Sequence, residues 1–294
     1  MDLVVRSPRF PRPGETLIGG PFQTAPGGKG ANQAVAAART GGQVGMVGCV
    51  GADDFGESLL AGLARDGVDH RRVKRDPDSA SGTATIIVDQ SGQNCIVVAP
   101  GANARLTVED VDAAEADIAA ARVLLLQLES PLIAVTHAAR LARSHGVRVL
   151  LNPAPAQPLP PELLACVDIL TPNESETASL TGLPVATEAD LESAARALQR
   201  MGPPVIILTL GERGALLALG GDQIDHFPAF AVTPVDTTAA GDAFVGALAV
   251  ALAEGRPLPE AVRWGNAAGA LATTRPGAQP SLPTRAEVEA LLAR

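Results

Sequence analysis

Short apolar segments alternate with amphipathic segments along most of the chain, and this alternation restricts the possible folds more than any other feature. Residues 123–127, 147–151 and 205–210 are short and almost wholly apolar, as in strands that are buried on both faces of a sheet. Residues 132–145 and 189–201 carry apolar residues at helical spacing. The alternation predicts an α/β fold with helices on both faces of a mostly parallel central sheet, a three-layer αβα arrangement.

The same pattern predicts further elements, which are helices at 30–38, 55–65 and 243–253 and strands at 43–50 and 168–171. Ligands of such parallel sheets gather at the carboxyl ends of the strands. We therefore expect functional side chains in the segments that follow the strands.

Two stretches depart from the alternation. Thr83–Val88 and Cys95–Val98 flank a loop that contains Gly92, which is a β-hairpin pattern. Residues 3–22 are interrupted by several prolines and show no helical spacing. We expect these stretches, at about 3–24 and 82–99, to form a small β-sheet lid on a single domain that spans residues 1–294.

Composition excludes several classes of function. The chain of 294 residues has a formal net charge of -9 and only 2% aromatic residues, which disfavours nucleic-acid binding through a basic surface or stacked bases. Its three cysteines form no CxxC pair, which fits a reducing compartment. No apolar run is long enough for a bilayer, and the first residues lack a signal-peptide pattern. We expect a cytoplasmic protein with no membrane partner.

The segment Ala239-Ala240-Gly241-Asp242 opens the apolar helix that is predicted at 243–253. A glycine at a helix start lets the backbone approach a phosphate, and the free N–H groups of the first turn point at it. The helix dipole is expected to keep Asp242 ionised and able to accept a proton. This combination suits phosphoryl transfer. The alternative is that Asp242 only stabilises the helix, as any acidic residue in a first turn can.

A second glycine-rich segment, Gly27 to Asn32, also leads into a helix. It lacks the spacing of a Walker A loop. Lys29 within it is one of only two lysines in the chain. An ordinary turn followed by a helix start is an equally good interpretation of this segment alone.

Three other candidates follow predicted strands. Glu129 lies after strand 123–127, where it is either a ligand-binding carboxylate or a solvated charge. Asn173 and Glu176 lie three residues apart and could hold a hydrated Mg²⁺ or form an N-cap box. Residues 209–214 form a glycine-flanked turn that suits either a nucleotide rim or a tight hairpin.

In this order along the chain, the motifs resemble the ribokinase-like (PfkB-type) carbohydrate kinase family, and the likeness covers essentially the whole sequence. The segments that carry it are Pro13-Gly14-Glu15-Thr16, Gly27 to Arg39, Gln127-Leu128-Glu129-Ser130, Leu151-Asn152-Pro153-Ala154-Pro155-Ala156, Thr171 to Glu176, Val235 to Phe244 and Arg275 to Ser281.

The resemblance implies the ribokinase-like fold and an ATP-dependent kinase that phosphorylates ribose at O5. At the matching positions, Asp242 would be the general base, and the amides of Ala239, Ala240, Gly241 and Asp242 would form an anion hole for the transferring phosphoryl group. The implied sugar contacts are Asp2, Gly28, Lys29, Gly30, Ala31, Asn32, Glu129 and Asp242. The implied nucleotide contacts are Asn173, Thr209, Leu210, Gly211, Glu212, Arg213, Gly214, Gly241 and Asn266.

The resemblance also implies two metals and a dimer. Asn173 and Glu176 would position Mg²⁺ through water. An activating monovalent cation, K⁺, would be held largely by backbone carbonyls in a loop that contains Asp236, Thr238, Ala272, Arg275, Gly277 and Ser281. Members of this type pair through their lids into homodimers.

The family pattern begins with a core strand that ends in Gly-Ser-x-Asn, immediately before the position that Asp2 matches, so a further strand is expected before Met1. Two other functions stay open. One is phosphorylation of another sugar or of a nucleoside, and the other is a sugar-binding protein with weak or no catalysis.

Overall fold

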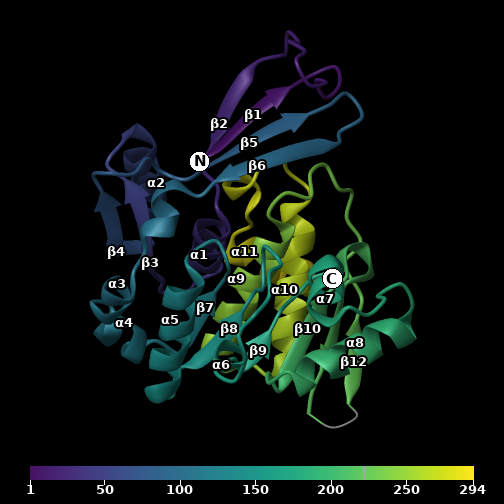
Figure 1. Cartoon of the computed structure of the whole chain (residues 1–294). Helices are drawn as coiled ribbons and strands as arrows, with labels where there is room; N and C mark the ends of the chain where they lie inside the picture. The colour runs from purple at the N-terminus through teal and green to yellow at the C-terminus, as the bar shows by residue number, and fades with distance from the viewer. Residues whose placement is uncertain (221–222) are drawn as a thin grey trace.

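The computed structural model describes residues 1–220 and 223–294, and its body is organised around a six-stranded sheet (Figure 1). The strand order is β12-β11-β10-β9-β8-β7. Strands β7 to β10 run parallel, β11 pairs antiparallel with β10, and β12 pairs antiparallel with β11. This confirms the mostly parallel sheet. The bounds are β7 Val123–Leu126, β8 Arg148–Leu151, β9 Ile169–Leu170, β10 Val205–Thr209, β11 Ala215–Ala218 and β12 Ile224–Phe227.

Successive residues of these strands point to opposite faces, so each strand contributes to two cores. In β10, Ile206 and Leu208 pack into the core that α5 and α8 cover, whereas Ile207 packs into the core that α1, α9 and α10 cover. Helices on both faces make the predicted αβα layers (Figure 1). Their bounds are α1 Lys29–Arg39, α5 Leu132–Ser144, α8 Glu188–Arg200, α9 Ala240–Ala253 and α10 Leu258–Ala272.

A separate parallel pair is formed by β3 (Gly45–Gly51) and β4 (Asp69–Asp76). The sequence pattern did not predict β4, because its residues are nearly all charged and only Val73 and Asp76 are buried. Charged side chains suit an edge strand, since they discourage further pairing.

The additional strand that was expected before Met1 stays a prediction. The remaining helices are α2 Asp54–Arg65, α3 Val108–Asp112, α4 Glu115–Ala120, α6 Pro161–Leu164, α7 Glu174–Thr181 and α11 Arg285–Leu292.

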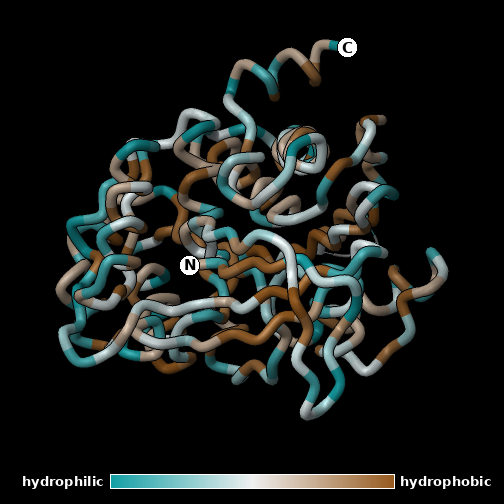
Figure 2. The backbone as a smooth tube through the Cα atoms, turned by 90° about the horizontal axis from the view of Figure 1, so that it is seen from above, coloured by the Kyte–Doolittle hydropathy of each residue, from teal (hydrophilic) through white to brown (hydrophobic). Residues whose placement is uncertain are grey.

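The lid is a four-stranded sheet of order β2-β1-β5-β6 above the body (Figure 1). β5 (Thr83–Val88) and β6 (Asn94–Ala99) form the predicted hairpin, and β1 (Asp2–Arg6) pairs in parallel with β5. β2 (Phe22–Ala25) completes the sheet. Seen from above, hydrophobic stretches of the lid run side by side next to the N-terminus (Figure 2). The strands of this sheet come from residues 2–25 and 83–99, and the division of the chain into one domain with a lid stays a prediction.

Among the described residues, no helix combines the length and the apolar character that crossing a membrane requires.

Candidate active site

Asp242 lies in the first turn of α9 and is 5% exposed. Two side chains of α1 donate hydrogen bonds to its carboxylate. Asn32 Nδ2 lies 2.9 Å from Oδ2, and Gln33 Nε2 lies 3.0 Å from Oδ1. The two glycine-rich segments of the sequence therefore meet at one place, because the beginnings of α1 and α9 pack against each other.

The backbone at the start of α9 is unusual. Ala239 has φ 59°, in the left-handed region, and it is the one non-glycine residue of the described chain with a positive φ. The amide of Ala240 donates to the carbonyl of Thr237 at 3.2 Å, whereas no described residue accepts from the amide of Gly241. A Cβ at Gly241 would meet no atom within 4 Å. Of the amides expected in the anion hole, that of Ala240 is therefore engaged in this structure and that of Gly241 is available, and the anion hole itself stays a prediction.

The surroundings of Asp242 act on its pKa in both directions. Burial raises the pKa of Asp242, although the Lys29 ammonium and the hydrogen bonds from Asn32 and Gln33 lower it. A first-turn position favours the ionised form through the helix dipole, but removal from water is the larger effect here. A carboxyl group with a raised pKa is a better proton acceptor once it is ionised.

Two further carboxylates lie beside the glycine-rich loop. Glu129 follows β7, and its Oε2 accepts the Lys29 amide N–H at 2.8 Å. Asp2, at the start of β1, lies so close to Gly27 that a Cβ there would be 2.2 Å from its Oδ2. Burial raises the pKa of Asp2 and of Glu129, and the charge of Asp242 raises both further. These residues form a polar, partly buried group at the carboxyl end of the sheet, under the lid.

The residues expected on the nucleotide side lie after β9 and β10. Asn173 and Thr209 form a parallel bridge, and Thr209 N donates to Pro172 O at 3.0 Å. Residues 210–214 form a tight hairpin between β10 and β11, closed by a bond from Leu210 N to Gly214 O. Asn266 lies on α10, and its Nδ2 donates to the backbone carbonyls of residues 227 and 228.

Asn173 and Glu176 form the N-cap box that the sequence left as an alternative. Asn173 Oδ1 accepts Glu176 N and Glu176 Oε2 accepts Asn173 N, each at 2.8 Å. Burial raises the pKa of Glu176. Over residues 1–220 and 223–294, no three His, Cys, Asp or Glu side chains gather as a group that could hold a metal. A Mg²⁺ near Glu176 would therefore depend on water and phosphate oxygens for most of its ligands.

The residues expected at the monovalent cation lie in two loops that are bonded together. Asp236 Oδ1 accepts Thr238 N at 2.9 Å, and its Oδ2 accepts Gly277 N at 2.8 Å. Burial acts to raise the pKa of Asp236, but the bonds from Thr238 and Gly277 outweigh it and hold the pKa below its ordinary value. Ala272 and Ser281 are buried in this region. The carboxylate and the turn carbonyls around it suit a hard cation.

The side chain of Arg275 is not part of this cation group. Its guanidinium is bonded to Glu287 on α11, so its side chain faces a different element. Only its backbone carbonyl remains as a possible cation ligand, which is the kind of contact that the sequence comparison implied.

Two functional candidates were missed by the sequence analysis. Gln33 Nε2 also donates to Asn152 Oδ1 at 3.0 Å, and Asn152 Nδ2 donates to Thr171 O at 2.9 Å. The signal for Gln33 was a long polar residue in an otherwise alanine-rich helix, directly after Asn32. The signal for Asn152 was an amide at the end of an apolar strand.

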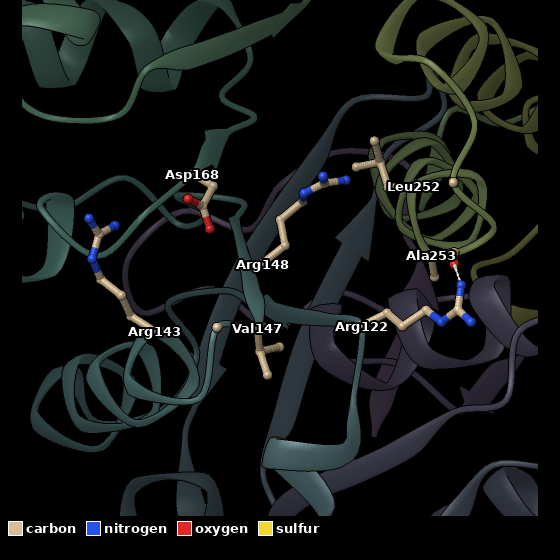
Figure 3. Close-up of a pocket in the computed structure, with 9 residues that line it drawn as sticks. Arg122, Arg143, Val147, Arg148, Asp168, Leu252 and Ala253 are labelled. Atoms are coloured by element: carbon tan, nitrogen blue, oxygen red, sulfur yellow. Dashed lines mark hydrogen bonds between the residues drawn. The ribbon is translucent and has the colours of Figure 1, made fainter.

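A hollow of about 590 Å³ lies at the opposite, amino-terminal ends of β8 and β9 (Figure 3). Its arginines, Arg122, Arg143 and Arg148, leave the backbone in different directions. Arg122 Nη1 donates to the carbonyl of Ala253, which satisfies the end of α9. This hollow is separate from the Asp242 region.

Comparisons with known proteins agree with this geometry. The family model described as pfkB family carbohydrate kinase matches residues 1–285. A ribokinase of Haemophilus influenzae is 45% identical over 286 residues, which are 97% of this chain and 93% of that protein. A deoxyribokinase of Salmonella typhi is 40% identical over 285 residues, 97% of this chain and 93% of that protein.

Among solved structures, the Arabidopsis thaliana ribokinase complexed with ribose and ATP is 33% identical, with a TM-score of 0.92 over 100% of this chain and 96% of that one. The fold, the helix start at Asp242 and the match over nearly the full length point the same way, and the chain belongs to the pfkB family of carbohydrate kinases.

Proposed function

We propose that the protein transfers the γ-phosphoryl group of ATP to the O5 hydroxyl of D-ribose and forms ribose 5-phosphate. The observation that carries the proposal is the meeting of Asp242, at an open helix start, with the carboxylates of Asp2 and Glu129 beside the glycine-rich loop. Relatives that are named ribokinases, and the structural neighbour that binds ribose and ATP, support this substrate pair.

In the proposed reaction, Asp242 accepts the proton of the O5 hydroxyl as the oxygen attacks the γ-phosphorus. The O–P bond to ribose forms, the bond from the γ-phosphorus to the bridging oxygen breaks, and ADP leaves. The free Gly241 amide and the positive end of α9 lie where negative charge on the phosphoryl group would be stabilised. The Lys29 ammonium offsets the cluster of carboxylates that surrounds the site.

On the sugar side of the site, one buried acceptor has no hydrogen-bond donor. Asn32 Oδ1 is buried and has no partner within the described residues. A buried acceptor without a donor is costly, so this oxygen fits a sugar hydroxyl that donates to it. Asp2 and Glu129, as acceptor-only groups when ionised, would take further hydroxyl protons of the same ligand.

Two metals belong to the proposal. Mg²⁺ would neutralise charge on the ATP phosphates, and Glu176 with Asn173 would hold it through water. K⁺ would bind between the loops that Asp236 connects. The loop that contains Asp236 and Thr238 leads directly into Ala239 and the proposed anion-hole amides, so a cation there would stiffen the backbone that faces the phosphoryl group.

A homodimer through the lid completes the proposal. Ile96, Val97 and Val98 of β6 are 50%, 67% and 59% exposed, and Phe22 of β2 is 62% exposed. A thin sheet with apolar residues on an open face is stabilised by a partner sheet. Cys49, Cys95 and Cys166 are free thiols, which supports a cytoplasmic location.

The deoxyribokinase relative favours 2-deoxyribose as a second candidate substrate. A coupled assay of ADP formation with ribose, 2-deoxyribose, fructose, adenosine and fructose 6-phosphate separates the possibilities. We expect ribose to give the highest kcat/KM, because a site that binds a hydroxyl rejects analogues that lack it. A higher kcat/KM for another acceptor would assign that substrate instead, and no turnover with any of them would support a binding protein.

A further inference from the structure

We propose that Gln33 is a positioning residue, which together with Asn152 holds the Asp242 carboxylate in the orientation needed to accept the hydroxyl proton. This inference rests on the proposed function, because Asp242 is the base only if the protein is a kinase. Gln33 does not touch the sugar or the nucleotide in the proposal. It acts through Asp242.

The geometry is that of a chain of hydrogen bonds. The amide nitrogen of Gln33 carries two hydrogens, and its two acceptors are Asp242 Oδ1 and Asn152 Oδ1, both at 3.0 Å. Asn152 in turn donates to the backbone carbonyl of Thr171 at 2.9 Å. Gln33 and Asn152 therefore connect the Asp242 carboxylate to the backbone at the carboxyl ends of β8 and β9.

The second carboxylate oxygen has a different partner. Asn32 donates to Oδ2 and Gln33 donates to Oδ1, so the two donors together define the plane of the carboxylate. The last torsion of an aspartate is intrinsically broad. Without Gln33, the Asn32 bond alone would leave the carboxylate free to rotate about its Cβ–Cγ bond.

The packing of α1 against α9 brings Gln33 within reach. A Cβ at Gly246 would lie 2.7 Å from the Gln33 carbonyl oxygen and 2.6 Å from Ala36 Cβ, so the two helices are in close contact one turn beyond Asp242. Gln33 itself is 1% exposed. A side chain at this position cannot reach solvent and has to satisfy its polar atoms locally.

A glutamine at position 33 lowers the stability of the fold if its role is only structural. Its Oε1 is buried and has no partner within the described residues. A buried acceptor without a donor costs stability, and an apolar residue of the same length would avoid that cost. The N–H groups that the glutamine presents to Asp242 and Asn152 explain why a polar residue stands here.

The charged groups that face Asp242 come from several elements. Lys29 of α1 favours its ionised form, whereas the charges of Asp2 in β1, Glu129 after β7 and Glu176 of α7 oppose it. All of them remain when Gln33 is replaced. A hydrogen bond to the ionised carboxylate lowers its pKa, so loss of the Gln33 bond should raise the pKa of Asp242.

The test compares Gln33→Met with Gln199→Met, a matched control. Gln199 on α8 also donates to backbone carbonyls at the end of β11, including Leu219 O at 2.8 Å, and not to Asp242. For Gln33→Met we expect a kcat loss of about 10²-fold, the usual effect of a misplaced group. We also expect KM values within about two-fold of the unmutated protein. The acid limb of the kcat profile should move upward by about one pH unit.

Asn152→Leu tests the second link. If Asn152 acts through Gln33, the double variant is no slower than Gln33→Met alone, since the two losses are then not additive. Gln33→Leu replaces Gln33→Met if the latter does not fold. A kcat loss without a shift of the acid limb, or effects equal to those of Gln199→Met, would overturn the proposal.

A readout that does not need turnover separates this inference from the proposed function. The carboxyl carbon of Asp242 can be titrated by NMR in the unmutated protein and in Gln33→Met. A higher pKa in the variant supports the positioning role even if no sugar is phosphorylated. An unchanged pKa overturns it even if ribose is confirmed as the substrate.

Discussion

Asn32 and Asp242 are 210 positions apart in the chain, yet the amide of one donates a 2.9 Å hydrogen bond to the carboxylate of the other. This contact joins the two glycine-rich segments into one site. It also places a buried proton acceptor beside the first-turn amides of α9, and the predictions below depend on that juxtaposition.

Replacing the base should abolish most turnover without preventing nucleotide binding. For Asp242→Asn we expect kcat to fall by about 10²–10⁴-fold, the usual contribution of a general base. Binding of ATP, measured by calorimetry, should change little. Asp54→Asn is the control, because Asp54 is also a first-turn acidic residue, at the start of α2, but is exposed. Turnover of Asp242→Asn equal to that of the control would refute the base assignment.

Glu129→Gln should stabilise the fold while weakening ribose binding. Burial raises the pKa of Glu129, so its ionised form is disfavoured in the folded state at neutral pH. The glutamine removes that charge and should raise the Tm at pH 7 by roughly 2–4 °C, the effect of about 1 kcal/mol in a chain of this size. The gain should shrink as pH falls toward 4.5, because Glu129 then becomes protonated itself.

The matched control for that variant is Glu15→Gln. Its ion pair with Arg9 lowers the pKa of Glu15 to about 2, but the pair is on the surface and contributes little. Scanning calorimetry from pH 5 to 8 compares the two variants. A lower Tm for Glu129→Gln at pH 7 would contradict the direction of the pKa shift.

A side chain at Gly27 should disturb the sugar contacts in particular. The Cβ of Gly27→Ala would lie 2.2 Å from Asp2 Oδ2, so the Asp2 carboxylate has to move. We expect the KM for ribose to rise by about 10-fold or more, since one hydrogen bond to a charged group is affected, with less change in the KM for ATP. Gly45→Ala is the control, because its Cβ would meet no atom within 4 Å. Equal KM values for ribose in both variants would show that Asp2 does not contact the sugar.

Potassium should raise kcat through the Asp236 loop. Asp236 accepts hydrogen bonds from Thr238 and Gly277, and Asp236→Asn would weaken both the loop and the cation site. We expect lower kcat in Na⁺ or in a bulky organic cation than in K⁺, by up to about 10²-fold, the cost of losing an anion-hole donor. The variant should no longer respond to the exchange. Equal rates in all three salts for the unmutated protein would contradict the cation site.

The lid should pair two subunits in solution. Val97→Glu places a charge on the exposed apolar strand β6, where Val97 is 67% exposed, and should shift the protein from dimer to monomer. Light scattering at micromolar concentration measures the mass of both forms. The control is Ile133→Glu, at an apolar and 72% exposed position on α5, outside the four strands of the lid sheet. A monomeric mass for the unmutated protein would rule the dimer out.

Local sequence patterns determined much of the fold and named most of the candidate site. The helices α1, α5, α8 and α9, the parallel strands β7 to β10 and the lid hairpin were all predicted, because period and turn residues are local properties of a chain. The strand β4 was not, since its charged residues show no apolar alternation and it pairs only through its position beside β3.

Tertiary structure decided what the candidate residues do to one another. The start of α9 predicted that the helix dipole favours the ionised form of Asp242, whereas burial by the surrounding layers, which no local pattern shows, acts in the opposite direction and raises its pKa. Gln33 and Asn152 gained significance only when packing brought them together across 119 positions. Hydrogen bonds and desolvation depend on which surfaces meet in space, and no short sequence window contains both partners of such a contact.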